Sequence, residues 1–181
     1  EIGVLDGKSL LTWKDWFYQA NIVGIDINPD CKQYENKECR ISVEIGSQTD
    51  EIFLDKVTNE YGPFDMILDD GSHINEHVIY TFKKLFPFVK SQGVYIIEDV
   101  HTSYYEDYGG GRYKQGTILE YFKGIVDEVN FFGEWQESMD NMLARREDKL
   151  IEQFERKGYD YIGTQIESIN FLNGIILITK R

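Results

Sequence analysis

The chain has 181 residues, of which 41% are hydrophobic and 14% aromatic, so it can bury the core of one globular domain and is not an intrinsically disordered chain. Its formal net charge of −13 argues against nucleic acid or an anionic membrane surface as a partner, because both bind clustered lysine and arginine. The sequence shows no apolar run long enough to span a bilayer, no signal peptide and no disulfide framework. These features predict a cytoplasmic protein with free thiols at Cys31 and Cys39.

The first predicted elements have the layout of a nucleotide-binding strand-helix-strand unit. Residues 1–7, EIGVLDG, are expected to end a strand and form a glycine turn, and a helix capped by Ser9 is expected over 8–20. A second strand over 21–28 carries Asp26, which stands about twenty residues after the glycines, where an acid can accept hydrogen bonds from ribose hydroxyls. The pattern is E-x-G-x-x-x-G rather than G-x-G-x-x-G, so a purely structural tight turn is the alternative.

Strands and helices then alternate with short links. Strands are expected over 40–45, 64–68 and 94–97, because each is a short apolar run. Helices are expected over 51–61, before Gly-Pro, and over a segment whose apolar face lies within 78–86. This alternation predicts an α/β protein with a doubly wound, mostly parallel sheet.

Residues 100–116 interrupt the alternation. The segment is polar and contains four tyrosines and three consecutive glycines. Long irregular links at the strand ends of a compact domain are usually functional, so we interpret this segment as an active-site lid or a substrate wall. A surface excursion without a function is the alternative.

The last part of the chain predicts two helices and a hairpin. Helices are expected over 118–129 and 138–157. Two β-rich runs, 166–172 and 175–180, are joined by Asn173-Gly174, which is the strongest short-range signal for a β-hairpin. The sheet is therefore expected to end in an antiparallel hairpin, and nothing in the sequence divides the chain into two domains.

Acidic residues follow two of the predicted strands. Asp69 and Asp70 follow one strand, with His73 a turn further on, and Glu98 and Asp99 follow the next strand. Because ligands bind at the carboxyl ends of parallel strands, we expect these side chains to converge. Carboxylates that lie this close together repel one another unless a cation lies between them, and a divalent cation is the commonest solution. The sequence therefore predicts a metal site.

Other interpretations of these residues remain. An Asp-Asp pair after a strand can simply cap a loop, and His73 can cap the following helix. His73-Ile74-Asn75-Glu76-His77 also matches H-x-x-E-H, the inverted zinc peptidase signature. That chemistry needs both histidines one turn apart on a helix, whereas His73 is expected in the preceding turn.

The glycine motif, the acid at the end of the second strand and the terminal hairpin resemble class I S-adenosylmethionine-dependent methyltransferases. The stretches ILDDGSH, IIEDVHTSYY and GTILEYFKG resemble the metal-dependent sugar O-methyltransferases of macrolide antibiotic pathways, the mycinamicin type. This resemblance covers nearly the whole chain and implies a Rossmann-like sheet of seven strands. It implies Mg²⁺ or Mn²⁺ held by Asp70, Glu98 and Asp99, with His73 as the general base. His101 or Asp70 itself is the alternative base.

The same resemblance implies a cofactor site and a reaction. Adenosylmethionine would be bound by Glu1, Gly3 and Gly7 around the first turn, by Asp26 on the ribose, and by Ser47 and Gln48 beside the adenine, with Asp70 close to both ligands. The reaction would transfer the cofactor's methyl to a hydroxyl of a sugar or another vicinal diol, as part of a glycosylated natural product. Members of the family carry an N-terminal segment, so the natural chain is expected to start before Glu1. A catalytically silent binding module is the alternative. The acceptor and the oligomeric state, with a homo-oligomer among the options, stay open.

Overall fold

A computed structural model of the chain describes residues 1–130 and 161–181. The helix expected over 138–157 lies outside the described residues. The α-helices are α1 (Lys8–Trp16), α2 (Glu51–Tyr61), α3 (Asn75–Leu85), α4 (Ile118–Gly124), α5 (Val126–Val129) and α8 (Tyr161–Thr164). The strands are β1 (Ile22–Asp26), β2 (Ile41–Ile45), β3 (Phe64–Asp69), β4 (Val89–Ile97), β5 (Ile166–Leu172) and β6 (Ile175–Lys180). Short 3-10 helices cover Pro29–Tyr34, Phe86–Phe88, Val100–Tyr104 and Glu106–Tyr108.

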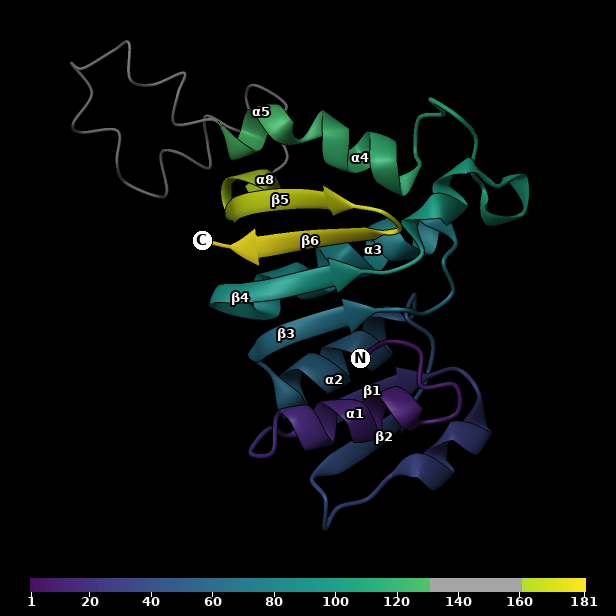
Figure 1. Cartoon of the computed structure of the whole chain (residues 1–181), viewed down its shortest axis with the longest axis vertical. Coiled ribbons are helices and arrows are strands. Elements are labelled where there is room, and N and C mark those ends of the chain that lie inside the picture. Colours follow the sequence, from purple (N-terminus) through teal and green to yellow (C-terminus); the bar gives the residue numbers. More distant parts are fainter. Residues whose placement is uncertain (131–160) are drawn as a thin grey trace, which may run out of the picture.

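One mixed sheet runs through the molecule, with α1 on one face and α2 and α3 on the other (Figure 1). β1 pairs with β2 and β3 pairs with β4, both in parallel, while β6 runs antiparallel between β4 and β5. Ile2 forms parallel bridges to both Ile25 and Asp69, so it joins the two halves of the sheet. This confirms a Rossmann-like α/β fold with a terminal hairpin. The described residues form six strands, and Ile2 alone stands where a seventh was expected.

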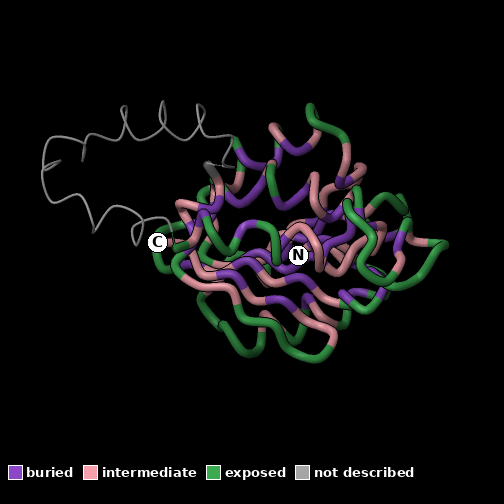
Figure 2. Tube along the Cα trace, turned by 90° about the horizontal axis from the view of Figure 1, so that it is seen from above, coloured by how far each residue is buried: buried purple, intermediate pink, exposed green. Residues whose placement is uncertain are grey.

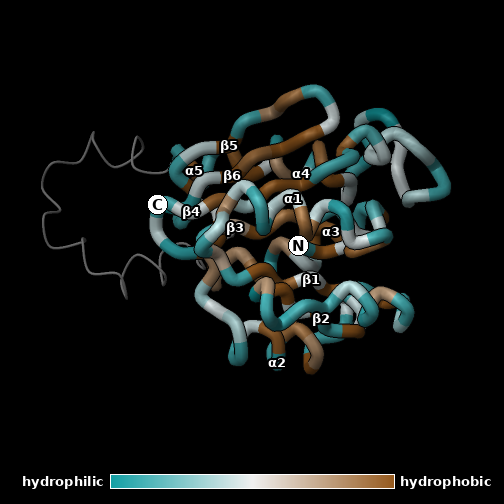
Figure 3. Tube along the Cα trace, turned by 60° about the horizontal axis from the view of Figure 1, so that its bottom comes forward, coloured by the Kyte–Doolittle hydropathy of each residue, from teal (hydrophilic) through white to brown (hydrophobic). Residues whose placement is uncertain are grey.

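Each face of the sheet has its own buried cluster. The larger cluster packs α2, α3 and α4 against β3, β4 and β6. Phe82 of α3 is central to it, because its ring lies 4.9 Å from Phe86, 5.2 Å from Tyr95 and 4.9 Å from Phe122. A smaller cluster packs Leu10 of α1 over the β1–β2 pair. Buried and apolar segments accordingly follow the strands, with exposed polar loops around them (Figures 2 and 3). Burial of these apolar side chains is the main favourable term in the stability of the fold.

Element boundaries differ from the sequence-based expectation in several places. α1 ends at Trp16 instead of residue 20, and its N-cap is Gly7 in the left-handed region (φ 72°). Ser9 is therefore not the cap, and its hydroxyl instead donates to the Glu1 carboxylate. The expected helix over 118–129 is divided between α4 and α5, with Gly124, a poor helix former, at the end of α4. β4 begins at Val89 because that residue pairs with Phe64.

Candidate metal centre and cofactor site

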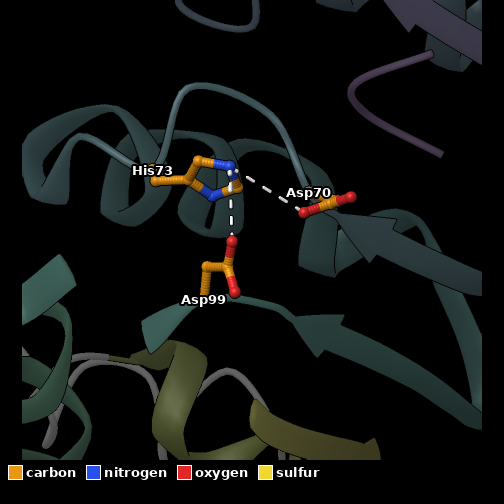
Figure 4. Close-up of side chains that lie close together, drawn as sticks. All are labelled: Asp70, His73 and Asp99. Carbon is orange, nitrogen blue, oxygen red and sulfur yellow. Dashed lines mark ion pairs between the residues drawn. The ribbon is translucent and has the colours of Figure 1, made fainter. Parts of the chain in front are cut away.

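Asp70, His73 and Asp99 converge where β3 and β4 end. Asp70 directly follows β3, and Asp99 lies two residues beyond β4, which pairs in parallel with β3. The Nε2 atom of His73 lies 3.9 Å from Oδ1 of Asp70 and 3.9 Å from Oδ2 of Asp99, and all three side chains point to one place (Figure 4). One ligand atom from each residue lies within 4.8 Å of the others. The predicted meeting of two strand ends is confirmed for these residues.

The backbone at the site is held in an uncommon conformation. His73 (φ 56°) and Asp99 (φ 53°) both lie in the left-handed region, which is costly for residues other than glycine and occurs often at functional sites. The buried hydroxyl of Thr102 lies 3.1 Å from the carbonyl oxygen of His73 and 2.9 Å from that of Asp99. One side chain therefore fastens the two loops together.

The negative charges of the acids at the site are unfavourable, because burial and mutual repulsion disfavour ionisation of Asp70 and Glu98. Burial raises the pKa of Asp70, the negative charge of Asp99 raises it further, and the nearby His73 opposes both effects. Burial and then the charges of Asp70 and Asp99 raise the pKa of Glu98. Glu98 lies outside the tight group formed with His73, but its backbone N–H donates to the Asp69 carbonyl at 3.0 Å. Carboxylate oxygens are the donors that Mg²⁺ and Mn²⁺ prefer, so the acids of this group suit either ion.

Asp69 does not join the other acids. It is 1% exposed, and burial raises its pKa to about 7. Its carboxylate accepts hydrogen bonds from the hydroxyl of Tyr95 at 3.2 Å and from Nε2 of Gln48 at 3.3 Å. Consecutive strand residues point to opposite faces, so Asp69 faces the core while Asp70 reaches the site.

The glycine turn is bound to the end of β1. The Asp26 carboxylate accepts hydrogen bonds from the backbone N–H groups of Val4 at 2.8 Å, Leu5 at 3.2 Å and Asn28 at 2.8 Å. Burial acts to raise the pKa of Asp26, but these hydrogen bonds outweigh it and hold the pKa below its ordinary value. Asp26 is thus an ionised, half-buried acid that fixes the turn containing Gly3.

The other predicted cofactor residues divide into two groups. The Glu1 carboxylate accepts hydrogen bonds from the Ser9 hydroxyl and from the Trp13 indole at 2.5 Å, so it binds α1. The Gln48 side chain is buried and bonded inside the protein. Ser47 is half-buried, and its hydroxyl lies 2.9 Å from that of Thr49. The side chains of Glu1 and Gln48 are therefore engaged by the chain itself.

Sequence reasoning missed Asn75, the first residue of α3. It is 1% exposed; its Nδ2 donates to the Tyr108 carbonyl at 2.8 Å, and its Oδ1 accepts from the Ile118 N–H at 2.7 Å. These bonds anchor the 100–116 segment in its middle and just beyond its end. The signal was present in the sequence, because Asn75 is a polar residue on the same helical stripe as Val78 and Phe82.

A cleft of about 1000 Å³ lies elsewhere in the molecule. Residues at the amino ends of strands line it, among them Ile22, Phe64 and Lys90. None of the three clustered residues at the strand carboxyl ends lines this cleft. Across the described ranges, we find no helix with the length and apolar character needed to cross a membrane.

The fold and the site together define a Rossmann-like protein with a nucleotide-type site and a candidate metal centre. Its parallel strands are closed by an antiparallel hairpin, its glycine turn is bound to an acid, and acids follow two neighbouring strand ends. Residues 1–100 match the family described as Methyltransferase domain. The chain belongs to this family.

Individual relatives agree with this placement. The chain is 42% identical over 126 residues to the mycinamicin VI 2''-O-methyltransferase of Micromonospora griseorubida, an alignment that covers 68% of this chain and 31% of that protein. It is 44% identical over 127 residues to the demethylmacrocin O-methyltransferase of Streptomyces fradiae, with coverage of 68% and 31%. The chain therefore spans about a third of the length of these curated relatives.

Solved structures show the same fold. The MycE methyltransferase from the mycinamycin biosynthetic pathway, in complex with Mg and SAH, superposes with a TM-score of 0.79 at 32% identity, covering 99% of this chain and 44% of that one. An O-methyltransferase from Bacillus cereus superposes with a TM-score of 0.52 at 19% identity, covering 99% and 72%, which supports the fold alone.

Proposed function

We propose that this chain is the catalytic domain of an S-adenosylmethionine-dependent O-methyltransferase that requires Mg²⁺ or Mn²⁺. Its acceptor is a hydroxyl of a sugar or another vicinal diol on a small-molecule natural product. The observation that carries the proposal is the convergence of Asp70, His73 and Asp99 at the strand ends, beside the glycine turn. The names of two relatives, mycinamicin VI 2''-O-methyltransferase and demethylmacrocin O-methyltransferase, support the substrate class.

Each residue of the centre has a role in this reaction. Asp70, Glu98 and Asp99 would hold the metal through their carboxylates, whose mutual repulsion it relieves. When bound, Mg²⁺ supplies a Lewis acid and a template for two neighbouring hydroxyls. His73 accepts the hydroxyl proton, because its Nε2 faces the same space as the carboxylates. The acceptor oxygen bonds to the methyl carbon while the carbon–sulfur bond breaks and its electron pair stays on sulfur.

The cofactor side of the proposal rests on the first turn. Gly3 and Gly7, both at positive φ, form the turn proposed to lie beside the cofactor, and Asp26 can still accept bonds from ribose hydroxyls. Ser47 lies on the loop after β2. Asp70 completes the proposed set. The side chains of Glu1 and Gln48 are engaged internally, so neither is proposed to contact the cofactor through its side chain.

The 100–116 segment is proposed as the acceptor wall. Asn75 and Thr102 hold it, and Tyr104 and Tyr105 are more than half exposed, at 53% and 52%. Exposed aromatic rings offer apolar faces on which a sugar ring can pack. Because Asn75 of α3 binds Tyr108 and Thr102 binds the loop at His73, the segment is held at two points, and we favour a fixed wall over a moving lid.

The zinc peptidase alternative is disfavoured by geometry. His73 precedes α3, and the Nδ1 atom of His77 lies 3.0 Å from the Ser72 hydroxyl. His77 also stays outside the three-residue cluster. The two histidines therefore do not form the paired helical ligands that this signature requires.

Calorimetric titration with adenosylmethionine, with and without Mg²⁺, tests the proposal together with methyl transfer to glycosides that carry a vicinal diol. We expect cofactor binding and transfer that stops in EDTA. Transfer that continues at the same rate in EDTA would contradict the metal's role. Cofactor binding without transfer to any acceptor, with Mg²⁺ supplied, would favour the silent binding module.

A further inference from the structure

A buried polar network lies beneath the loop that carries Asp70 and His73. Its members are the side chains of Tyr95 on β4, Asp69 on β3, Gln48 on the loop after β2, and Thr81 on α3. Asp69 accepts from Tyr95 and Gln48, and Nε2 of Gln48 also donates to the Thr81 hydroxyl at 3.1 Å. All four residues are buried, so every bond in the network is shielded from water.

Gln48 connects this network to the loop. Its Oε1 accepts the backbone N–H of Ser72 at 2.7 Å, and Ser72 lies between Asp70 and His73 in the chain. The neighbouring bonds of the loop are longer: Gly71 N–H to Asp69 at 3.4 Å, and Ile74 N–H to the Ser72 hydroxyl at 3.4 Å. The hydrogen bond from Ser72 N–H to the side-chain oxygen of Gln48 is therefore the shortest of these three.

Gly71 explains how the amide fits. A Cβ at this position would lie 2.4 Å from Oε1 of Gln48 and 2.9 Å from Cγ2 of Ile2. Gly71 is not among the residues with positive φ, so space and not backbone conformation requires glycine here. The glycine of DDGSH thus makes room for the amide that holds the loop.

We propose that Gln48 is a positioning residue of the metal centre, which holds the backbone at Ser72 so that Asp70 and His73 face Asp99. The inference rests on the proposed function in that a divalent metal binds at this centre. It departs from the role beside the adenine that the sequence resemblance implied. Both ends of the Gln48 amide already have protein partners, and only 8% of the residue is exposed.

The variant Gln48→Leu tests this role, because it keeps similar bulk and removes every bond of the amide. We expect Mn²⁺ affinity, measured by electron paramagnetic resonance, to fall about tenfold or more, as is typical when an outer partner of metal ligands is lost. The dissociation constant for adenosylmethionine, measured by calorimetry in EDTA, should change less than threefold. Gln33→Leu, at an exposed position, is the matched control and should alter neither.

Three results would overturn the inference. Weaker cofactor binding with unchanged Mn²⁺ affinity would restore the role beside adenine. Unchanged affinities for both would leave Gln48 without a role at the centre. An equal loss of Mn²⁺ affinity and cofactor affinity would indicate a general loss of stability. Ile41→Val is the control for that loss, because it lowers stability in the separate cluster under α1 without changing the network.

A second variant keeps the test open if Gln48→Leu fails to fold. Thr81→Val removes one hydroxyl that Gln48 contacts, so we expect a smaller loss of Mn²⁺ affinity in the same direction. The double variant should lose less than the sum of the single losses, because both residues act through one network. Wild-type protein that binds no Mn²⁺ would reject the proposed function itself, a result distinct from failure of this inference.

Discussion

Gly3 lies directly against the backbone of Asp70: a Cβ on Gly3 would stand 2.2 Å from the Asp70 carbonyl oxygen. The Asp70 N–H also donates to the Ile2 carbonyl at 3.0 Å. The turn proposed to bind the cofactor and the loop proposed to bind the metal are therefore in backbone contact. A change at this backbone contact itself is expected to affect both.

Gly3→Ala should lower both stability and ligand binding. Gly3 has φ +91°, so alanine would be strained there, and its methyl would also collide with Asp70. We expect a loss of about 2 kcal/mol or more in the free energy of unfolding, measured by urea denaturation. Affinities for adenosylmethionine and for Mn²⁺ should fall together.

Gly174→Ala is the matched control for this prediction. Gly174 also has positive φ (+77°), but nothing lies within 4 Å of a Cβ built there. It should therefore show the cost of strain alone, about 1 kcal/mol. Equal losses in the two variants would mean that the contact with Asp70 contributes nothing.

Asp70→Asn should stabilise the metal-free protein and abolish its response to metal. The pKa of Asp70 is raised in the folded state, chiefly by burial. Protonated Asp70 therefore stabilises the folded state at low pH, and this contribution to the free energy of unfolding is lost as pH rises through the folded-state pKa. At neutral pH the ionised acid is thus unfavourable. In EDTA the variant should melt above wild type, while Mg²⁺ should raise the melting temperature of wild type only.

Asp15→Asn on α1 controls for the loss of one negative charge, because Asp15 is exposed and lies away from the strand ends. Its melting temperature should still respond to Mg²⁺. A Mg²⁺ response retained in Asp70→Asn would remove Asp70 from the metal ligands.

His73→Asn should remove turnover and keep the fold. Asparagine tolerates the left-handed conformation that His73 adopts (φ 56°), so the loop can persist. Loss of a general base should lower kcat by about 10² to 10⁴-fold, in single-turnover assays with any acceptor that wild type methylates. Cofactor affinity should be unchanged.

His101→Asn is the comparison for the identity of the base. The Nδ1 atom of His101 lies 3.7 Å from Oδ1 of Asp99, at the rim of the site. We expect less than a tenfold loss of kcat. A larger loss here than in His73→Asn would transfer the role of base to His101.

Asp69→Asn should change how stability depends on pH. Burial raises the pKa of Asp69 from 3.8 to about 7, so protonation favours the folded state, and wild type should lose stability as pH rises between these values. Asparagine carries no charge and can still bond Gln48 and Tyr95. The difference in unfolding free energy between variant and wild type should therefore increase from pH 5 to about 7 and then level. Parallel profiles would contradict this prediction.

Local signals in the sequence predicted much of the fold. The helix over 51–61 was predicted with its observed bounds because Gly62-Pro63 follows its end, and the structure shows that Asp50 caps its start. The hairpin at Asn173-Gly174 and the end of β4 at Ile97 were likewise predicted from residues close by in the sequence. In each case the deciding residues are neighbours in the chain.

Side-chain partners were harder to predict because they depend on distant segments. Gln48 bonds Ser72 and Thr81, which belong to other elements, so its inward direction could not be deduced from its own loop. Glu98 was expected with the tight group of ligands, and the structure places His73 there with the two aspartates. Asp70 was chosen over Asp69 from the family resemblance, and the residues alone support the same choice, since alternate strand residues face opposite sides.

The left-handed backbone at His73 and Asp99 has a consequence for comparing related proteins. These are places where glycine is the least strained residue, so a histidine and an aspartate there cost stability, which their proposed roles in the metal centre would explain. A homologue that does not need these roles could gain stability from glycine at either place. Glycine there would therefore indicate a homologue that keeps the fold but has lost the proposed methyl transfer.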